Sequence, residues 1–426
     1  MTGRRLQILI VGPNSDGTDV GEAWSTYRWV QGLAAEHDVT LLTYRKRDRA
    51  SAVEQLPGVK VVEWTDLPLV GRFERFNSMA KPGYIPFYIR ARRWLRAAQR
   101  EGRTFDVVHQ VAPLALRYPC PAVGFGWPIV IGPVAGSLDT PKPFAAEVGG
   151  DRWYTRLRDI DGWRLRNDPW LRRSYEQAAA VIGVAPYVRD TVLAGLNIRR
   201  FEVCSETGVT SLPDVQPDAR TGDRDASAPL RLLHVGRLVR TKGLRDAVRA
   251  LGEVGAAWPW QLDVLGEGPD RVACEAEASQ LGIADRVRFH GRLPREQVED
   301  YYRAADVFVF PSFREPSGNV VLEAMSHGLP TIVADRGGPA AAVTATCGVR
   351  VAVTSPSEYV HALAEALHTL ARDRAAREAM GQAARQRIAS DYLWPRKIAW
   401  LSQLHQSLAV ETRREPVATG EAVGSY

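Results

Sequence analysis

Two carboxylates and a short polar loop stand together in the second half of the chain. Glu315 lies in the loop, and seven residues separate it from Glu323, about one turn into the predicted helix Gly318–His327. The apolar run Val307–Phe310 before the loop and the run Thr331–Ala334 after the helix have the length and composition of buried strands. A strand–loop–helix–strand unit predicts a parallel sheet. The loop is therefore expected at the carboxyl edge of that sheet and against a helix N-terminus, where phosphate-bearing ligands bind.

Two cations follow an earlier predicted strand, Leu230–Val235. Gly236 and Arg237 come directly after this strand, and Lys242 and Gly243 open the next helix. Two positive side chains at a strand-to-helix turn, next to the positive end of the helix dipole, suit a diphosphate. Solvated charges beside an ordinary turn explain the same residues, so both interpretations stay open at this point.

Two glycine-bearing turns and a histidine hold similar positions at strand ends. Gly266 opens GEGP after the strand Gln261–Leu265, and it would let a backbone or a flat base approach closely. Arg292 closes FHGR after another strand, and His109 ends the strand Phe105–His109. A plain turn explains the first two, and a hydrogen-bonded core histidine is a serious alternative for His109.

The elements that position these residues form two α/β halves joined by a polar segment. The first half is expected to hold strands at residues 6–11, 39–43, 59–63, 105–109, 129–131, 181–184 and 201–204, and helices at 21–36, 87–101, 151–180 and from 186. The second half is expected to hold strands at residues 230–235, 261–265, 287–290, 307–310 and 331–334, and helices from 243 and at 271–281, 296–305, 318–327, 359–387 and 394–408. Residues 213–229 are polar, lack aromatics and are typical of a linker.

We therefore expect an α/β protein with two doubly wound, Rossmann-like domains that face each other across a cleft. The expected divisions are a first domain at residues 1–209, a linker at 210–229, a second domain at 230–390, a C-terminal helix at 391–410 that crosses back to the first domain, and a disordered tail at 411–426.

Composition limits the class of protein further. A chain of 426 residues is too long for one ordinary domain. The net charge of +6 suits an anionic ligand or surface and is too mild to indicate nucleic acid. The four cysteines are far apart and show no metal spacing, so we expect no metal site and no disulfide framework. The chain shows no signal-peptide pattern and no apolar stretch of membrane-spanning length, which predicts a cytoplasmic protein, at most peripheral on the inner face of the membrane.

Taken in order, four segments resemble the retaining family 4 glycosyltransferases of the GT-B fold, also described as glycosyl transferases group 1. The segments read HVGRLVRTKGL, VLGEGP, VRFHGRLP and DVFVFPSFREPSGNVVLEAMSHGLPTIVADRGG. The resemblance is specific across Leu230–Gly338, which carries an E-x7-E signature and an Arg-x4-Lys pair. It is looser in the first half, where DVVHQ resembles the acceptor-side histidine of the family and ETGV at Glu206 resembles its domain-closing turn.

The resemblance implies a hexosyltransferase that moves a sugar with retention from a nucleotide sugar to a hydroxyl group. The expected acceptor is a glycan, a lipid-linked saccharide or a lipid in cell-envelope or exopolysaccharide biosynthesis. The first domain would bind this acceptor, and the second would bind the donor. UDP-sugars are the commonest donors of the family, and its members usually need no metal or other cofactor.

The resemblance also implies a role for each candidate residue. Arg237 and Lys242 would hold the donor diphosphate and stabilise it as a leaving group. Glu323 would bind the ribose, Glu315 the donor sugar, and His109 would lie near the reacting hydroxyl. The predicted catalytic residues are Glu315, His109, Arg237 and Lys242, and the predicted donor-binding residues are Gly12, Gly236, Arg237, Lys242, Gly266, Arg292, Glu315, Ser317, Gly318, Asn319, Val320 and Glu323.

Two departures from the family pattern affect these assignments. The family often has Phe-Gly after the first glutamate, whereas this chain has Pro316 and Ser317 with the glycine delayed to Gly318, which leaves the donor sugar open. The loop GPNSDGTDVGEAW also differs from the common Gly-Gly form, so the glycine that meets the phosphate is not fixed.

Other functions remain as alternatives. A small soluble, natural-product acceptor and a sugar-nucleotide-binding protein without turnover both fit the same donor residues. A nicotinamide dehydrogenase fits poorly, because no GxGxxG follows the first strand of either half.

Two basic segments in the acceptor-side half also predict contact with an anionic membrane surface, against the alternative of a solvated helix face. The first segment holds Arg90, Arg92, Arg93, Arg96 and Arg100, and the second holds Arg152, Trp153, Arg156, Arg158, Trp163, Arg164, Arg166, Trp170, Arg172 and Arg173.

Overall fold

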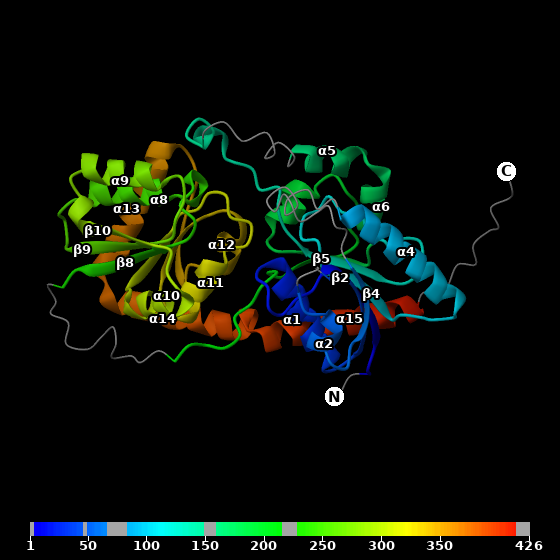
Figure 1. Ribbon diagram of the computed structural model, residues 1–426. Coiled ribbons are helices and arrows are strands. Elements are labelled where there is room, and N and C mark those ends of the chain that lie inside the picture. Colours follow the sequence, from blue (N-terminus) through cyan, green and yellow to red (C-terminus); the bar gives the residue numbers. More distant parts are fainter. Residues whose placement is uncertain (1–3, 46–48, 66–82, 149–158, 215–227, 415–426) are drawn as a thin grey trace.

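The chain folds into two α/β lobes that lie side by side (Figure 1). The structure is a computed structural model, and it describes residues 4–45, 49–65, 83–148, 159–214 and 228–414. The expected architecture of two doubly wound parallel sheets is confirmed.

The first lobe contains a seven-stranded parallel sheet in the order β3-β2-β1-β4-β5-β6-β7. Its strands are β1 (Gln7–Asn14), β2 (Asp38–Arg45), β3 (Lys60–Thr65), β4 (Val107–Gln110), β5 (Ile129–Val134), β6 (Ala180–Gly183) and β7 (Phe201–Val203). The central strands are apolar on both sides because helices cover both faces, as in β1, where Ile8 to Val11 are all buried. The strand order reverses between β1 and β4, so a crevice opens at their carboxyl ends.

Helices cover the first sheet on both faces. α1 (Glu22–Ala34), the short α2 (Ala52–Gln55) and α15 (Trp394–Arg414) pack on one face. α4 (Tyr84–Arg100), α5 (Asp159–Asn167) and α6 (Pro169–Glu176) pack on the other. Short helical turns lie at η2 (Lys142–Phe144) and η4 (Val188–Val192).

The second lobe contains a six-stranded parallel sheet in the order β10-β9-β8-β11-β12-β13. Its strands are β8 (Leu230–Val235), β9 (Trp260–Leu265), β10 (Val287–Gly291), β11 (Val307–Phe310), β12 (Thr331–Ala334) and β13 (Gly348–Val351). One face is covered by α8 (Leu244–Val254), α9 (Arg271–Gln280) and α13 (Pro356–Arg372), and the other by α10 (Arg295–Ala304), α11 (Asn319–Ser326), α12 (Gly337–Ala342) and α14 (Arg374–Arg387). Further short turns are η5 (Arg240–Lys242), η6 (Ala284–Arg286) and η7 (Ile388–Tyr392). The reversal of strand order falls between β8 and β11, the two strands that carry the candidate donor residues.

Two predicted long helices are each divided into two shorter helices, so the prediction of continuous helices is wrong. The expected helix at residues 359–387 is divided into α13 and α14 at Asp373, which is extended and accepts a hydrogen bond from Ala376 N at 2.9 Å. The described part of the expected helix at 151–180 is divided into α5 and α6 at Asp168, whose side chain caps α6 ahead of Pro169. A side chain that caps a new helix ends the preceding one, because it satisfies the amides that the longer helix would have used. Residues 151–158 of this prediction lie outside the described residues.

The small elements α12 and β13 have no counterpart in the prediction. The α12 sequence, GGPAAA, is made of glycine, proline and alanine, and the β13 sequence, GVRV, is only four residues long, so neither carries a clear apolar period. Most of the predicted linker, residues 215–227, lies outside the described residues. The same holds for residues 415–426 of the predicted tail, whereas its first four residues continue helix α15 to Arg414.

The last helix lies along the first lobe and passes beneath the junction between the lobes (Figure 1). Trp394 at its start packs edge-on against Trp29 of α1 with ring centroids 5.0 Å apart. Ile398 fills the space over Gly32, where an added Cβ would lie 2.4 Å from the Ile398 side chain. No helix in the described ranges is long and apolar enough to span a bilayer.

Candidate active site

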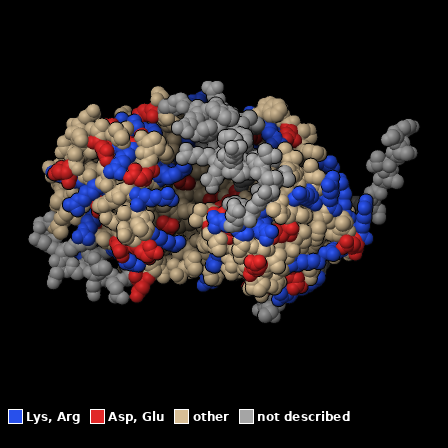
Figure 2. Space-filling view, viewed as in Figure 1, with Lys and Arg blue, Asp and Glu red and all other residues tan. Residues whose placement is uncertain are grey.

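A cavity of about 510 Å³ lies between the two lobes, at the carboxyl ends of both sheets. Figure 2 shows the molecule hollowed at this junction. The first-lobe side of the cavity is lined by Glu22, Leu114, Ala115, Ala135, Gly136 and Glu206, and the second-lobe side by Gly236, Arg237, Lys242, Phe310, Glu315, Pro316, Ser317, Gly318, Asn319 and Val320. Eight residues predicted for the site therefore meet in one cavity: Gly236, Arg237, Lys242, Glu315, Ser317, Gly318, Asn319 and Val320.

The second-lobe side presents two cations from the turn after β8. Arg237 is exposed, and its guanidinium forms no hydrogen bond or ion pair with a described residue. Lys242 ends the turn η5, and its ammonium forms an ion pair with Glu315 and lies 5.7 Å from the centre of the Phe310 ring. The two positive groups thus face the same space, which is the arrangement that a diphosphate requires.

The loop before α11 adds backbone donors to these cations. Glu315 Oε1 accepts hydrogen bonds from the amides of Ser317 and Gly318 at 3.3 and 3.2 Å. Gly318 adopts a left-handed conformation, and an added Cβ would lie 2.9 Å from the Pro339 ring, so glycine is required there. Helix α11 then begins without a side-chain cap, which leaves its first amides available to an anion.

The first-lobe side presents carboxylates, and the sequence analysis did not assign them to the site. Glu22 is the first residue of α1, and its Oε2 accepts a hydrogen bond from Leu114 N at 3.2 Å. Glu206 follows β7 and accepts a hydrogen bond from the Ser317 hydroxyl of the opposite lobe. Ala135 and Gly136 follow β5. The sequence carried a signal only for the lining residues after β4 and β5, because these two segments must meet at one edge of a parallel sheet.

Burial and neighbouring negative charge change the ionisation of Glu206. Burial raises the pKa of its carboxyl group, and the charges of Glu315 and Glu22 raise it further, although the hydrogen bond from Ser317 acts in the opposite direction. The resulting pKa is about 7, so this carboxyl group exchanges a proton near neutral pH.

His109 does not line the cavity, and its predicted role near the reacting hydroxyl stays a prediction. Its side chain is fully buried at the end of β4, where its Nε2 bonds to Gly132 O at 2.7 Å and its Nδ1 to Nε2 of His405 at 3.1 Å. Burial lowers the pKa of His109 to about 4, so the ring is neutral. The physical reason is strand alternation, which points this side chain toward α15 rather than into the cleft. The alternative of a hydrogen-bonded core histidine is the one that the geometry supports.

Two predicted glycines serve backbone packing and do not line the cavity. Gly12 lies within β1, and an added Cβ would lie 2.7 Å from Thr26 of α1, so it permits close packing of strand and helix. Gly266 has a φ of +133°, and an added Cβ would lie 1.8 Å from Gly236 O. Gly266 therefore supports the donor turn through the backbone of Gly236.

Arg292 and Glu323 also lie outside the lining of the cavity. Arg292 is exposed beyond the end of β10. Glu323 lies one turn into α11, behind Asn319 and Val320, and its Oε2 accepts a hydrogen bond from the Tyr302 hydroxyl at 3.2 Å. Burial raises the pKa of Glu323 above its ordinary value. Their roles toward a nucleotide stay predictions.

Comparison with known proteins assigns the chain to a family. Residues 220–387 match the family described as glycosyl transferases group 1, and residues 20–204 match a glycosyl transferase 4-like domain. The chain is 30% identical to D-inositol 3-phosphate glycosyltransferase 2 of Catenulispora acidiphila over 354 residues, which cover 75% of each chain. The chain belongs to the glycosyl transferases group 1 family. The expected family and its GT-B fold are confirmed.

Other relatives match over shorter stretches. Glycogen synthase of Mycobacterium tuberculosis is 34% identical over 172 residues, which are 40% of this chain and 41% of that protein. This chain therefore matches less than half of the length of that relative. The 2-deoxystreptamine glucosyltransferase of Streptomyces kanamyceticus is 30% identical over 233 residues, covering 50% of this chain and 57% of that protein.

Two solved structures share the fold over nearly the whole chain. Sucrose-phosphate synthase from Thermosynechococcus elongatus superposes with a TM-score of 0.65 at 23% identity, covering 96% of this chain and 100% of that chain. The Anabaena protein HepE in complex with UDP superposes with a TM-score of 0.64 at 17% identity, covering 94% and 100%. At these identities the likeness concerns the fold.

Proposed function

We propose that this group 1 glycosyltransferase transfers a sugar with retention from a UDP-sugar, without a metal ion, to an acceptor at a membrane surface. The observation that carries the donor part is the cavity in which Arg237, Lys242 and the amides at the start of α11 face one space. Cations and a helix N-terminus bind a diphosphate, and they stabilise the charge that develops when it leaves the sugar. The structure of HepE with UDP supports the choice of nucleotide only as a precedent in the same fold.

The donor residues divide into two tasks in this proposal. Arg237 and Lys242 neutralise the diphosphate, and Lys242 must exchange part of its contact with Glu315 for phosphate oxygens. Glu315, released from that ion pair, is then placed beside the sugar, where a carboxylate favours positive charge on the ring in the transition state. Glu323, one turn along α11, would bind the ribose hydroxyls.

A panel of donors tests this proposal. We expect UDP-sugars to raise the melting temperature of the protein more than GDP, dTDP or ADP sugars, because a ligand that binds the native state stabilises it. We also expect the protein to turn over the preferred UDP-sugar equally well with and without EDTA. Stabilisation by a UDP-sugar without hydrolysis or transfer would instead identify a sugar-nucleotide-binding protein.

The acceptor part of the proposal comes from the exposed side of helix α4. Ile85, Ile89, Arg93, Arg96 and Arg100 recur at helical spacing, so they share one face, and all five are exposed. Figure 2 shows the positive side chains gathered over α4.

Two exposed tryptophans extend this face. Trp163 is 59% exposed, and Trp170 is 68% exposed and lies 6.0 Å from Tyr88 of α4. Apolar side chains interleaved with arginine, and tryptophans beside them, are typical of a helix that lies in an anionic membrane interface. Several other arginines of the predicted patch are used within the protein: Arg90 bonds to Thr65 O, Arg92 to Pro121 O, Arg164 to Asp168 and Arg172 to Glu176. Arg166 and Arg173 are exposed, and the remaining candidates Arg152, Trp153, Arg156 and Arg158 lie outside the described residues.

Vesicle co-sedimentation tests membrane contact. We expect the wild-type protein to sediment with anionic vesicles at low salt, and not with neutral vesicles or in high salt, because screening weakens attraction to surface charge. Changing Arg93, Arg96 and Arg100 together to Ser should abolish sedimentation. Changing Arg199, Arg288 and Arg292 together to Ser removes the same charge from elsewhere and is the control. Equal binding to DNA would identify a cationic surface that does not distinguish a membrane from nucleic acid. No binding to anionic vesicles at low salt would show that this face of α4 is only solvated.

A small acceptor that carries an amino group is the second candidate. The observation in its favour is the acidic first-lobe side of the cavity, where Glu22 and Glu206 face the space opposite the donor residues. A relative with 30% identity is named a 2-deoxystreptamine glucosyltransferase. Transfer to an amino sugar in solution, with loss of affinity for it in Glu22→Gln, would favour this candidate over a membrane acceptor.

A further inference from the structure

A segment of the first lobe lies on the second lobe, and we call it the strap (residues 136–148). It leaves the cavity at Gly136, directly after β5, and crosses to the second lobe (Figure 1). There Asp139 pairs with Arg336 at 2.7 Å, and the Thr140 hydroxyl accepts a hydrogen bond from Arg314 at 2.7 Å. Arg314 lies next to Glu315 in the loop before α11, and Arg336 lies directly before α12. The strap therefore lies along the edge of the second lobe.

Phe144 anchors the strap in the core of the second lobe. Its side chain is fully buried and belongs to the apolar core under α8 and α13 rather than to either core of its own lobe. The ring lies 4.6 Å from the ring of Phe313 and 5.7 Å from that of Tyr359. Removal of a fully buried ring leaves a cavity that the surrounding core cannot fill, so this contact is a firm attachment.

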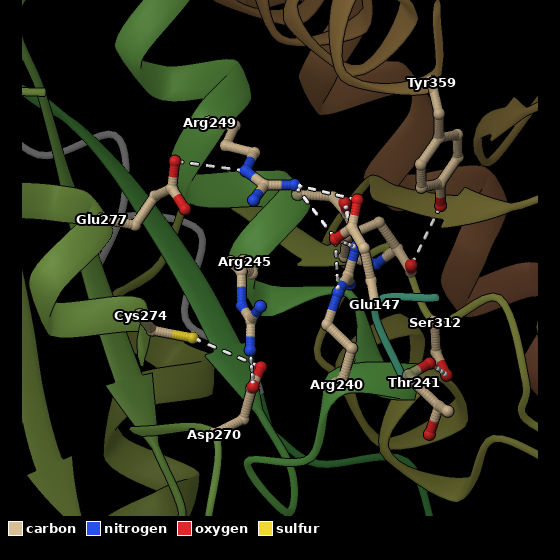
Figure 3. A network of polar contacts seen from close by, with 12 residues as sticks. Glu147, Arg240, Thr241, Arg245, Arg249, Asp270, Cys274, Glu277, Ser312 and Tyr359 are labelled. Atoms are coloured by element: carbon tan, nitrogen blue, oxygen red, sulfur yellow. Dashed lines mark hydrogen bonds and ion pairs between the residues drawn. The ribbon is translucent and has the colours of Figure 1, made fainter. Parts of the chain in front are cut away.

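Glu147 forms the polar part of the attachment. Its carboxylate accepts hydrogen bonds from Arg240 at 2.8 and 3.0 Å and from Arg249 at 3.2 Å, and Figure 3 shows both guanidinium groups directed at it. Arg240 also binds the fully buried Asp246 at 2.6 and 2.7 Å. Burial raises the pKa of Glu147, but the hydrogen bonds and charge of Arg240 outweigh it, so the net pKa is lowered and the carboxylate is ionised at neutral pH.

The strap therefore touches both elements that carry the donor chemistry. Arg240 and Lys242 belong to the same short turn, η5, and Phe313 precedes Glu315 by two residues. The guanidinium of Arg240 lies beside this pair of rings, 5.8 Å from the centre of Phe144 and 5.2 Å from the centre of Phe313.

One hydrogen bond then joins the turn to the loop, and a second joins the loop to α13. The Ser312 hydroxyl donates to Thr241 O at 3.0 Å, and the Tyr359 hydroxyl donates to Pro311 O at 2.9 Å (Figure 3). A displacement of Phe144 or Glu147 would thus be transmitted to Lys242 and to Glu315 together.

We propose that Phe144 and Glu147 are positioning residues for sugar transfer, through which the acceptor-side lobe holds Lys242 and Glu315 in place. The proposal rests on the donor roles given above to these two residues. Because the strap comes from the opposite lobe, the donor groups reach their working geometry only when the two lobes stand as they do here. Separation of the lobes would pull on the strap and loosen η5 and the loop before α11. Donor chemistry is thereby coupled to closure of the cleft over an acceptor.

Conservative variants with matched controls test the proposal. Glu147→Gln removes the charge and keeps the shape, and Phe144→Leu keeps an apolar side chain and removes the ring. Glu277→Gln is the control for the first, because Glu277 also pairs with Arg249, at 3.2 Å, but belongs to the second lobe. Lys142→Ala is the control for the strap itself, since Lys142 is exposed. Each protein is examined for its melting temperature, its kcat and KM for the donor, and hydrogen exchange of the amides in residues 311–318.

We expect both test variants to lose about tenfold in kcat with a donor KM within about threefold of wild type, because misplaced groups lose transition-state contacts before ground-state binding. The amides of residues 312–315, 317 and 318 should exchange faster in the two test variants and at the wild-type rate in both controls.

Two results would overturn the proposal: kcat and exchange in the test variants equal to those of the controls, or a loss of activity that disappears when each variant is assayed at an equal distance below its melting temperature. Wild-type protein that processes no sugar nucleotide would defeat the proposed function instead, and the exchange comparison would still decide whether the strap holds the donor loop.

Discussion

The two halves of the cavity are built in different ways. The second-lobe half is made of two compact units, the turn after β8 and the loop that leads into α11, and its chemistry is cations and backbone amides. The first-lobe half takes its residues from four separate places in the chain: Glu22, Leu114 and Ala115, Ala135 and Gly136, and Glu206. Its chemistry is carboxylates and small side chains. The second-lobe half is thus formed by local turns, whereas the first-lobe half is formed by segments that are distant in the sequence.

This difference fits the ligands that the two halves are proposed to bind. The diphosphate is the same in UDP-, GDP-, dTDP- and ADP-sugars, so a short and rigid arrangement of donors serves it. Acceptors differ widely in shape and charge, and loops from several strand ends can change independently to suit them. The following predictions test whether the halves divide the work in this manner.

The largest effect is expected from the cation of the donor half. Lys242→Ala should lower turnover by about two orders of magnitude or more, because it removes a charge-assisted contact to the leaving diphosphate. Its fold should survive, since the residue faces the cavity. The control is Lys60→Ala, an exposed lysine on the outer strand β3. Turnover of Lys242→Ala close to that of the control would show that Lys242 does not stabilise the leaving diphosphate.

A smaller effect should separate the two carboxylates within the donor half. Glu315→Gln is expected to lower kcat by about tenfold or more with little change in donor affinity, because this group acts where charge develops. Glu323→Gln should weaken donor binding by several fold, about the worth of one hydrogen bond, and leave kcat nearly unchanged. Calorimetric donor affinity and initial rates, measured for both variants, check the division. The opposite pattern would exchange their roles.

In the first-lobe half of the cavity, Glu206 should make the melting temperature of the protein depend on pH. The pKa of Glu206 is raised from an ordinary value of 4.5 to about 7, so its folded form holds the proton more tightly than its unfolded form. Stability from this group is complete below about pH 4.5 and is lost as the pH rises to about 7, after which it changes no further. The melting temperature of wild type should therefore fall relative to Glu206→Gln across that interval. Parallel curves for the two proteins would place the pKa of Glu206 near its ordinary value.

The smallest effect on catalysis is expected at His109. His109→Gln breaks buried hydrogen bonds to Gly132 and His405, so it should lower the melting temperature by the equivalent of about 1–3 kcal/mol. Turnover at a temperature where the variant is folded should stay within about threefold of wild type. A hundredfold loss of kcat with an unchanged melting temperature would show that His109 takes part in the reaction.

The contrast between the halves also explains what could be predicted from sequence. Arg237, Lys242 and Glu315 each lie within a few residues of a strand end, so the strand pattern was enough to bring them together. Glu22 at the start of α1 and Glu206 after β7 are far apart in the sequence of the first lobe, and no local pattern shows that their side chains face the same space. For His109, the end of a strand locates the backbone and not the direction of the side chain, which here points under a helix from the far end of the chain.

The strap escaped prediction for a related reason. Its sequence, DTPKPFAAEV, has the prolines and small residues of a surface loop. Only the pocket formed by Phe313 and Tyr359 makes Phe144 a core residue, and that pocket belongs to another lobe. Local propensity describes the segment correctly as irregular and says nothing of where it docks.

Helix α15 imposes an order on the folding of the chain during synthesis. Its side chains Trp394, Ile398, Leu401 and Leu404 complete the apolar core against α1 and β1, more than 350 residues after those elements have been made. The second lobe has all its strands between Leu230 and Val351, so it can close while the first still exposes an unfinished face to solvent and chaperones. The lobe that leaves the ribosome first is thus the last to be finished.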